Sequence, residues 1–314
     1  MEKIKGIELA ESFYNDYGRA MISECFGELE NKIAVALVGS GSECLGYDDE
    51  ISCDHDHYAG FCMLVPDDID SRAEFALERA YAKLPKEYRG FKREKLDPVG
   101  GNRHGVIKIG DFFESKTGKR NGQLTEREWL LVPEQALLEA TGGKVFRDDL
   151  GELTRIRKSL EYLPENVRLK KLAGNLLLMA QSGQYNYQRS ISRGHTASAQ
   201  LATFEFVRAT LNVIFLLNKR YIPYYKWTFV ALDELKILSS LHTPLEYLIS
   251  SENSPSEATK KSQIMEEVSS EIIAELKRQE LSGTEASELE AHAYFVNNKI
   301  TSADLRNLHI LAGV

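Results

Sequence analysis

Cysteine is scarce in this 314-residue sequence and is confined to its first part. The four cysteines are Cys25, Cys44, Cys53 and Cys62, and none follows residue 62. They cannot form a disulfide framework along the whole chain, so reduced thiols in a reducing compartment are the simpler interpretation.

A long apolar segment is also lacking. The residues Met1 to Glu8 are too polar for a signal peptide. No uninterrupted apolar run approaches the roughly 20 residues that a membrane-spanning helix needs. The longest, Leu211 to Leu217, contains Asn212. We therefore expect a cytoplasmic protein with no membrane partner.

The sequence has no excess of positive charge. Lys and Arg number 39 against 47 Asp and Glu, which gives a net charge of -8. This argues against non-specific nucleic-acid binding, although a local basic groove stays compatible with it. Hydrophobic residues at 43% and charged residues at 27% are typical of globular proteins, and the length suits about two domains.

The first third of the chain contains both helical and strand patterns, in the order helix, strand, strand, helix, strand, strand. Apolar spacing predicts a helix over Ile7–Phe26 and a second one that runs to about Leu84, with its N-cap among residues Asp67 to Ser71. The strands are predicted at the four ranges Ile33–Val38, Ser52–Val65, Phe91–Leu96 and Gly105–Ile109. We expect residues 1–120 to form a domain with a mixed β-sheet and helices.

Beyond the Lys116–Gly122 connection the strand signal almost vanishes. Helical spacing returns repeatedly, and Ser198–Lys219 is apolar around most of its circumference, so it should be the central helix. Ser250–Lys261 looks like a polar linker. Residues 121–314 are therefore predicted to be an all-α bundle, which makes the whole chain α+β.

Two short motifs carry the chemical signal. Gly39-Ser40 follows the first apolar strand, and Asp54-His55-Asp56 lies on the next one. Residues two apart on a strand point to the same face, so the two carboxylates would lie side by side and repel each other. A divalent cation resolves that repulsion, and Mg²⁺ prefers such hard oxygen ligands. Asp54 and Asp56 are the predicted metal ligands.

Together these motifs resemble the nucleotidyltransferase superfamily, which has the DNA polymerase β-like fold. The wider run from Gly39 to Asp56 looks like an uncharacterised bacterial family within it that has a helical C-terminal half. The resemblance implies Mg²⁺ (or Mn²⁺) at Asp54 and Asp56, and a phosphate cradled by Gly39, Ser40 and Ser42. It implies transfer of a nucleoside monophosphate, with ATP as the first choice of donor.

The acceptor is left open by the sequence. The domain arrangement resembles the aminoglycoside nucleotidyltransferases, so a hydroxyl or amine of a small molecule is the first expectation. Protein and nucleic-acid acceptors stay as alternatives. The alternative function is a non-catalytic nucleotide-binding or interaction protein on a degenerate scaffold of the same fold.

The non-catalytic alternative arises because a third carboxylate is hard to assign. Many members of the superfamily have such a carboxylate on a later strand, as a metal ligand or general base. The strand after His104 contains no acid, so Asp111 is the candidate, and the competing reading makes it a helix N-cap. Glu94 and Asp97 are weaker candidates.

The helical half offers anion-binding residues. Arg189 and Arg193 lie among aromatic and polar side chains and could contact phosphates. Arg189 and His195 also have a spacing seen in helical ribonucleases, which is common by chance. Glu205, Arg208 and Asn212 form a polar stripe that is either an internal ion-pair network or the wall of a cleft. A zinc site at Cys44, Cys53 and Cys62 lacks any usual ligand spacing.

Overall fold

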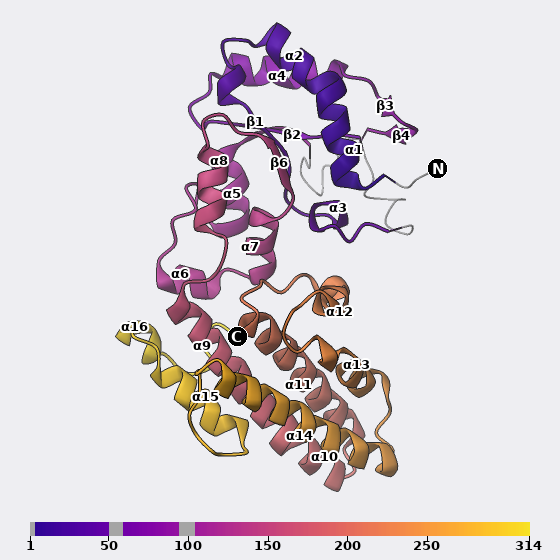
Figure 1. Ribbon diagram of the computed structural model, residues 1–314, viewed down its shortest axis with the longest axis vertical. Coiled ribbons are helices and arrows are strands. Elements are labelled where there is room, and N and C mark those ends of the chain that lie inside the picture. The colour runs from indigo at the N-terminus through magenta and orange to yellow at the C-terminus, as the bar shows by residue number, and fades with distance from the viewer. Residues whose placement is uncertain (1–3, 50–58, 94–103) are drawn as a thin grey trace. The chain divides into compact units, whose positions relative to one another are not determined.

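The computed structural model describes residues 4–49, 59–93 and 104–314 (Figure 1). The chain forms two compact units. Unit 1 contains Met1–Gln123 and Val132–Glu161, and unit 2 contains Leu124–Leu131 and Tyr162–Val314. Unit 1 is α/β and the described part of unit 2 is helical, so the α+β class is confirmed. Unlike the predicted division at residue 120, residues 132–161 belong to the first unit.

Unit 1 is built on a four-stranded mixed sheet with the strand order β5-β2-β1-β6. Central β1 (Ala34–Leu37) runs antiparallel to β2 (Cys62–Val65), pairing Ala36 with Cys62. β2 runs parallel to β5 (Gly105–Lys108), pairing Cys62 with Gly105. The C-terminal end of β1 therefore lies at the same end of the sheet as the start of β2 and of β5.

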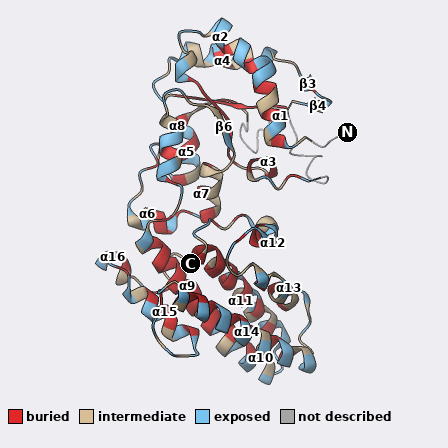
Figure 2. Cartoon of the chain, viewed as in Figure 1, coloured by how far each residue is buried: buried red, intermediate tan, exposed pale blue. Residues whose placement is uncertain are grey.

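The two central strands are buried along their whole length, as an apolar run without alternation requires. Helix α1 (Gly6–Phe13) and the π-helix η1 (Tyr14–Gly18) supply Phe13 and Tyr14 to the core (Figure 2). Their rings contact Phe61 at centroid distances of 5.9 and 5.4 Å. The predicted helix Ile7–Phe26 is thus real, but π geometry interrupts it before α2 (Arg19–Cys25).

Strand β6 (Lys144–Arg147) lies outside the domain to which the sequence assigned the strands. It pairs antiparallel with β1 as an edge strand. Phe146 stacks on Tyr14 at 6.1 Å, and Arg147 forms an ion pair with Glu30 at 2.5 Å. A four-residue strand with a charge at each end has too little alternation to be recognised in sequence.

The remaining elements of unit 1 cover the sheet or connect its strands. Helix α4 spans Ser71–Lys83, as predicted, and Asp70 caps its N-terminus by accepting from the N–H groups of Arg72 and Ala73. The others are η2 (Glu30–Lys32), α3 (Ser42–Leu45), β3 (Glu87–Tyr88), β4 (Phe91–Lys92), α5 (Ile109–Thr117), α7 (Glu134–Thr141) and α8 (Glu152–Ser159).

Unit 2 is organised around α9 (Glu165–Met179) and α11 (Thr196–Leu217), which pack on each other. The central position of α11 confirms the prediction for the long apolar helix. By length and composition alone α11 could also cross a membrane, but 61% of its apolar window is buried, as in a core helix. Around this pair lie α6 (Glu126–Leu131), η4 (Ala180–Tyr187), α10 (Gln188–Ser192), α12 (Tyr225–Asp233), η5 (Ser239–Leu241), α13 (His242–Ser250), α15 (Leu289–Asn298) and α16 (Ala303–Arg306).

The predicted polar linker at residues 250–261 is wrong. Helix α14 begins at Pro255 and continues to Arg278. Pro255 stands at the first helical position, where its missing N–H costs nothing. Lys261 is fully buried, and its Nζ donates to the carbonyl oxygen of Ser251 at 2.7 Å. A buried polar network therefore orders a segment whose composition resembles a linker.

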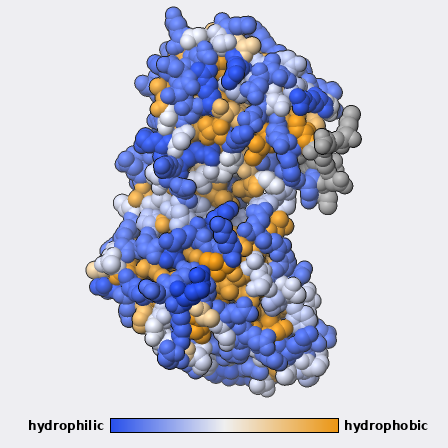
Figure 3. Space-filling model, viewed as in Figure 1, coloured by the Kyte–Doolittle hydropathy of each residue, from blue (hydrophilic) through white to orange (hydrophobic). Residues whose placement is uncertain are grey.

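The visible surface of both units is mainly hydrophilic, with apolar side chains scattered between polar ones (Figure 3). This agrees with the globular composition of the chain.

Candidate functional site

The turn that follows β1 has a backbone that only glycine adopts without strain. Gly39 and Gly41 have φ angles of 106° and 125°. Ser42 then begins the one-turn helix α3, and it is 2% exposed. Its Oγ has no hydrogen-bond partner within the described residues. A buried hydroxyl and two glycines after a buried strand form a compact polar turn into which a ligand oxygen could fit.

The loop that leaves this turn is fixed to the start of α1 by Asp48. The Asp48 side chain is 2% exposed, and its Oδ2 accepts from the N–H of Gly6 at 2.9 Å. Lys5 Nζ contacts Oδ1 of Asp48 at 3.3 Å and its carbonyl oxygen at 2.7 Å. A carboxylate at a helix N-terminus satisfies an unpaired amide and interacts favourably with the helix dipole.

The turn between α7 and β6 contacts α3, the helix that begins at Ser42. The N–H of Gly143 donates to the carbonyl oxygen of Cys44 at 2.8 Å. A Cβ on Gly143 would lie 2.0 Å from the carbonyl oxygen of Leu37, the last residue of β1. The guanidinium of Arg157 donates to the carbonyl oxygens of Thr141 at 2.6 Å and Gly143 at 3.3 Å. Burial lowers the pKa of Arg157.

The predicted metal ligands Asp54 and Asp56 lie outside the described residues, as do His55, Cys53, Glu94 and Asp97. Of the predicted strand Ser52–Val65, the structure describes residues 59–65, and β2 covers only Cys62–Val65. β2 starts at Cys62, opposite Ala36, so the chain enters β2 at the end of the sheet where β1 leads into Gly39.

Asp111 lies in the first turn of α5 and is exposed. The reading of Asp111 as an N-cap is wrong, because Lys108 occupies that position. Asp67 Oδ1 accepts from the N–H of Gly110 at 2.8 Å instead. Arg120 bonds to Asp111, and its Nη1 also lies 3.1 Å from Glu114.

The position of Asp111 follows from the parallel pairing of β2 and β5. α5 begins after the C-terminal end of β5, which is the end of the sheet opposite Gly39. The neighbouring Phe112, rather than Asp111, reaches the turn, with a ring atom 3.7 Å from a Cβ placed on Gly39. The carboxylate of Asp111 therefore lies away from the turn and bonds to Arg120. Its catalytic role stays a prediction.

The predicted anion-binding arginines belong to unit 2. Arg189 lies on α10 and its guanidinium stacks 4.5 Å from the ring centroid of Tyr185. Arg193 is the exposed C-cap of α10, and His195 is the N-cap of α11. The ribonuclease spacing from Arg189 to His195 therefore spans a helix end and a turn.

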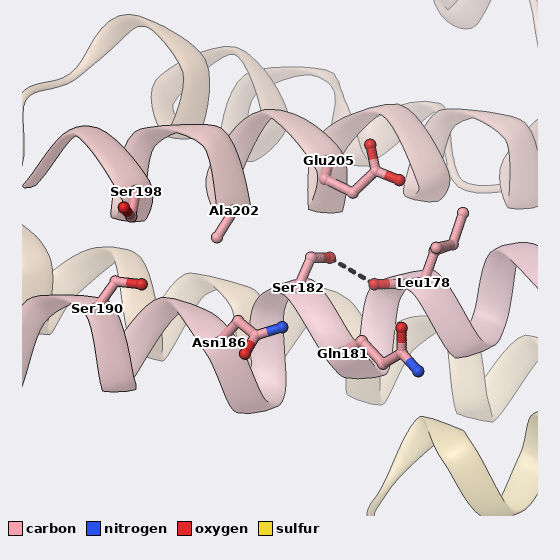
Figure 4. Close-up of a pocket in the computed structure, with 8 residues that line it drawn as sticks. All are labelled: Leu178, Gln181, Ser182, Asn186, Ser190, Ser198, Ala202 and Glu205. Carbon is pink, nitrogen blue, oxygen red and sulfur yellow. Dashed lines mark hydrogen bonds between the residues drawn. The ribbon is translucent and has the colours of Figure 1, made fainter. Parts of the chain in front are cut away.

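The polar stripe on α11 is a surface feature. Arg208 contacts Glu205 through Nη2 at 2.9 Å and Nε at 3.2 Å, and the two side chains are 53% and 38% exposed. The reading as an internal ion-pair network is therefore wrong. Glu205 instead lies in the lining of a groove that the sequence did not reveal (Figure 4).

For the zinc alternative, Cys44 and Cys62 are buried free thiols, and Cys53 lies outside the described residues. Within residues 4–49, 59–93 and 104–314, no three His, Cys, Asp or Glu side chains gather closely enough to hold a metal ion.

Comparison with known proteins gives one family match. The model of a domain of unknown function, DUF4037, matches residues 129–228. That range includes β6, which completes the sheet of unit 1, and it continues through α9 and α11 of unit 2. No curated protein matches the chain.

Proposed function

We propose that the protein is a metal-dependent nucleotidyltransferase that moves a nucleoside monophosphate, in the first instance AMP from ATP, to a hydroxyl or amine of a small acceptor. The observation that carries the proposal is the Gly39–Ser42 turn. This turn lies at the end of the sheet where the chain enters β2. In the sequence, Asp54 and Asp56 come shortly before the first residue of β2.

The residues of this turn, together with Asp54 and Asp56, suit a nucleoside triphosphate and its divalent cation. Backbone N–H groups beside Gly39 and Gly41 and the unpartnered Oγ of Ser42 offer donors to phosphate oxygens. Asp54 and Asp56 offer the hard carboxylate oxygens that Mg²⁺ selects. When bound there, Mg²⁺ would neutralise charge on the phosphates and the leaving pyrophosphate.

In the proposed step, the acceptor oxygen or nitrogen forms a bond to the α-phosphorus while the bond from that phosphorus to the bridging oxygen breaks. Pyrophosphate leaves with the bonding electrons, and the acceptor proton passes to a base or to water. The turn holds the phosphates in line, and Asp48 and Gly143 hold the turn. Rigid support of this kind lowers the cost of reaching the reactive geometry.

The test uses ATP labelled at the α-phosphorus, with Mg²⁺ and a panel of hydroxylated and aminated acceptors. We expect label transfer with wild type and its loss with Asp54→Asn. Asp68→Asn changes an exposed carboxylate elsewhere in unit 1 and should leave transfer intact. Wild-type protein that neither binds ATP with Mg²⁺ nor differs from Asp54→Asn contradicts the proposal.

A second candidate is a nucleotide-binding protein without turnover. It is favoured by the lack of an acid in β5 and by the contact of Asp111 with Arg120. Binding of ATP that depends on Mg²⁺ and on Asp54, without label transfer to any acceptor, would favour this candidate over the enzyme.

A further inference from the structure

Unit 2 contains a groove with a volume of about 340 Å³ on one side of a helical hairpin (Figure 4). One wall is η4 with α10, and the other is α11, which follows after a short turn. The side chains that face each other across it are small, among them Ser182, Ser190, Ser198 and Ala202. Short side chains on both walls leave the space between the helices unfilled.

The walls are polar and carry unused hydrogen-bonding groups. Gln181 and Asn186 contribute amide side chains to the lining from η4, and Ser190 and Ser198 place hydroxyls between the two helices. Within the described residues none of these four side chains bonds to another protein group, and Gln181, Asn186 and Ser198 are exposed. Ser182 differs, because its Oγ donates to the carbonyl oxygen of Leu178 at 2.5 Å. The groove thus offers both donors and acceptors to a ligand.

The charge of the groove is nearly balanced, because its one acidic side chain is paired with an arginine. Glu205 is the ionisable residue of the lining, and both of its carboxylate oxygens are engaged by Arg208 at 2.9 and 3.2 Å. No basic residue lines the groove, which disfavours a phosphate or another anion. Because Glu205 already has its counter-ion, an ammonium group gains little over a hydroxyl.

Two features beside the lining suit a ligand with one polar and one apolar face. Tyr185 precedes Asn186 on η4, is 56% exposed, and lies against Arg189. An exposed ring of this kind can cover C–H groups of a ligand. In addition, η4 is π-helical over eight residues, and such segments are rare and are frequent at functional sites.

We propose that this groove binds a neutral polyhydroxylated small molecule of the size of a monosaccharide. Amide and hydroxyl side chains are matched to ligand hydroxyls, the volume is at the small end of the range for ligand sites, and the charge balance excludes ionic recognition. The site lies wholly in unit 2 and is independent of the nucleotidyl-transfer proposal.

The test is saturation-transfer difference NMR on the full chain with glucose, galactose, mannose and N-acetylglucosamine as probes. We expect transfer to at least one of them. Ala202→Leu fills the groove and should weaken that binding at least about tenfold. Ala197→Leu makes the same change at an exposed position of α11 outside the lining, and it should bind as wild type does.

One further variant and one further probe complete the design. Asn186→Ala removes an amide from the lining without filling it, and binding should weaken while the unfolding temperature is unchanged. Glucosamine, which carries an ammonium group, should bind no more tightly than glucose. Absence of transfer to all four neutral sugars, or equal binding by Ala202→Leu and wild type, overturns the proposal. Preference for glucosamine overturns the assignment of a neutral ligand.

Discussion

At the scale of single residues, the Gly39–Ser42 turn is held by contacts that come from distant parts of the chain. Asp48 joins the following loop to α1, and Gly143 joins it to the α7–β6 turn. Arg157 fixes that second turn through two carbonyl oxygens. Three residues outside the proposed phosphate site therefore determine where that site lies.

Substitution of Gly143 by Ala tests this support. Gly143 has a φ of 75°, and the new Cβ would lie 2.0 Å from the carbonyl oxygen of Leu37. We expect the free energy of unfolding to fall by more than about 3 kcal/mol. The clash can be relieved only by a shift of the backbone at Leu37 or at Gly143, and that shift would move β1 or β6. Chemical denaturation measures it.

Gly151→Ala is the matched control for that substitution. Gly151 has a φ of 69°, and nothing lies within 4 Å of its added Cβ, so the variant has the strain of the backbone without the clash. Its cost should be about 1 kcal/mol. Equal costs for the two variants would show that Gly143 is not in close contact with β1.

Tyr81 makes the stability of the protein sensitive to alkaline pH. Burial raises the pKa of Tyr81 to about 12, although its OH accepts from the N–H of Phe61 at 3.1 Å. The pKa of Tyr81 in the folded protein is above the unfolded value of about 10. Its contribution to the free energy of unfolding is therefore complete below pH 10. It is lost as pH rises through about 12.

Between about pH 10 and pH 12, Tyr81→Phe should therefore lose less stability than wild type, by up to about 2 kcal/mol. Denaturant unfolding from neutral to alkaline pH measures the change. The exposed Tyr294→Phe is the control and should follow wild type. A Tyr81→Phe curve parallel to that of wild type would exclude Tyr81 as the source.

Some residue-level features followed from the sequence and others could not. The glycine turn after an apolar strand was predictable because strand and turn are adjacent in the chain. The partners Asp48 to Gly6 and Gly143 to Leu37 join residues far apart in sequence, and their pairing depends on the folded sheet. For Asp111 the sequence could not indicate the contact with Arg120, nine residues away across a helix end.

At the scale of secondary structure, the long periodic segments were the predictable ones. α11 matches the prediction within two residues at each end, and α4 follows one of the predicted N-cap residues and ends one residue before Leu84, because each has a sustained apolar face. β6 was missed, since it is an edge strand of four residues. The start of α14 was missed because its order depends on tertiary hydrogen bonds.

Those hydrogen bonds converge on the buried Lys261. Its Nζ reaches the carbonyl oxygen of Ser251 at 2.7 Å, Asn253 Oδ1 at 3.2 Å and Gln200 Oε1 at 3.3 Å. Asn253 Oδ1 also accepts from the OH of Tyr187 at 2.9 Å. The network joins the start of α14 to η4 and α11.

Lys261→Met should destabilise the protein by about 2–3 kcal/mol, because it removes the donor to the carbonyl oxygen of Ser251 and leaves Asn253 Oδ1 and Gln200 Oε1 with one donor fewer. Amide hydrogen exchange should become faster between residues 251 and 258. Lys260→Met, at the exposed neighbouring position, loses exposed contacts with Tyr247 and Glu257 and should cost less than about 1 kcal/mol. Unchanged exchange in Lys261→Met would mean that this network does not order the segment.

At the scale of the whole molecule, the residues that match the domain of unknown function are divided between the two compact units. Residues 129–228 contribute β6 to unit 1 and α9, η4 and α11 to unit 2. β6 pairs with β1, α9 packs on α15, and η4 packs on α14, and these partners all lie outside the matched range.

A fragment of residues 129–228 should therefore fail to fold cooperatively. It lacks the strand that satisfies the backbone of β6 and the helices that cover the apolar face of α9. Thermal unfolding followed by circular dichroism should show a gradual change for the fragment and a cooperative transition for the whole chain. A sharp transition for the fragment would contradict this view of the match.

The central claim is that Gly39, Ser40, Ser42, Asp54 and Asp56 together hold a nucleotide and its cation. A crystal structure with a non-hydrolysable ATP analogue and Mg²⁺ tests it most directly. We predict a triphosphate against the Gly39–Ser42 turn, with Mg²⁺ bridging it to the carboxylates of Asp54 and Asp56. A nucleotide bound elsewhere, or no metal at these two carboxylates, would contradict the account.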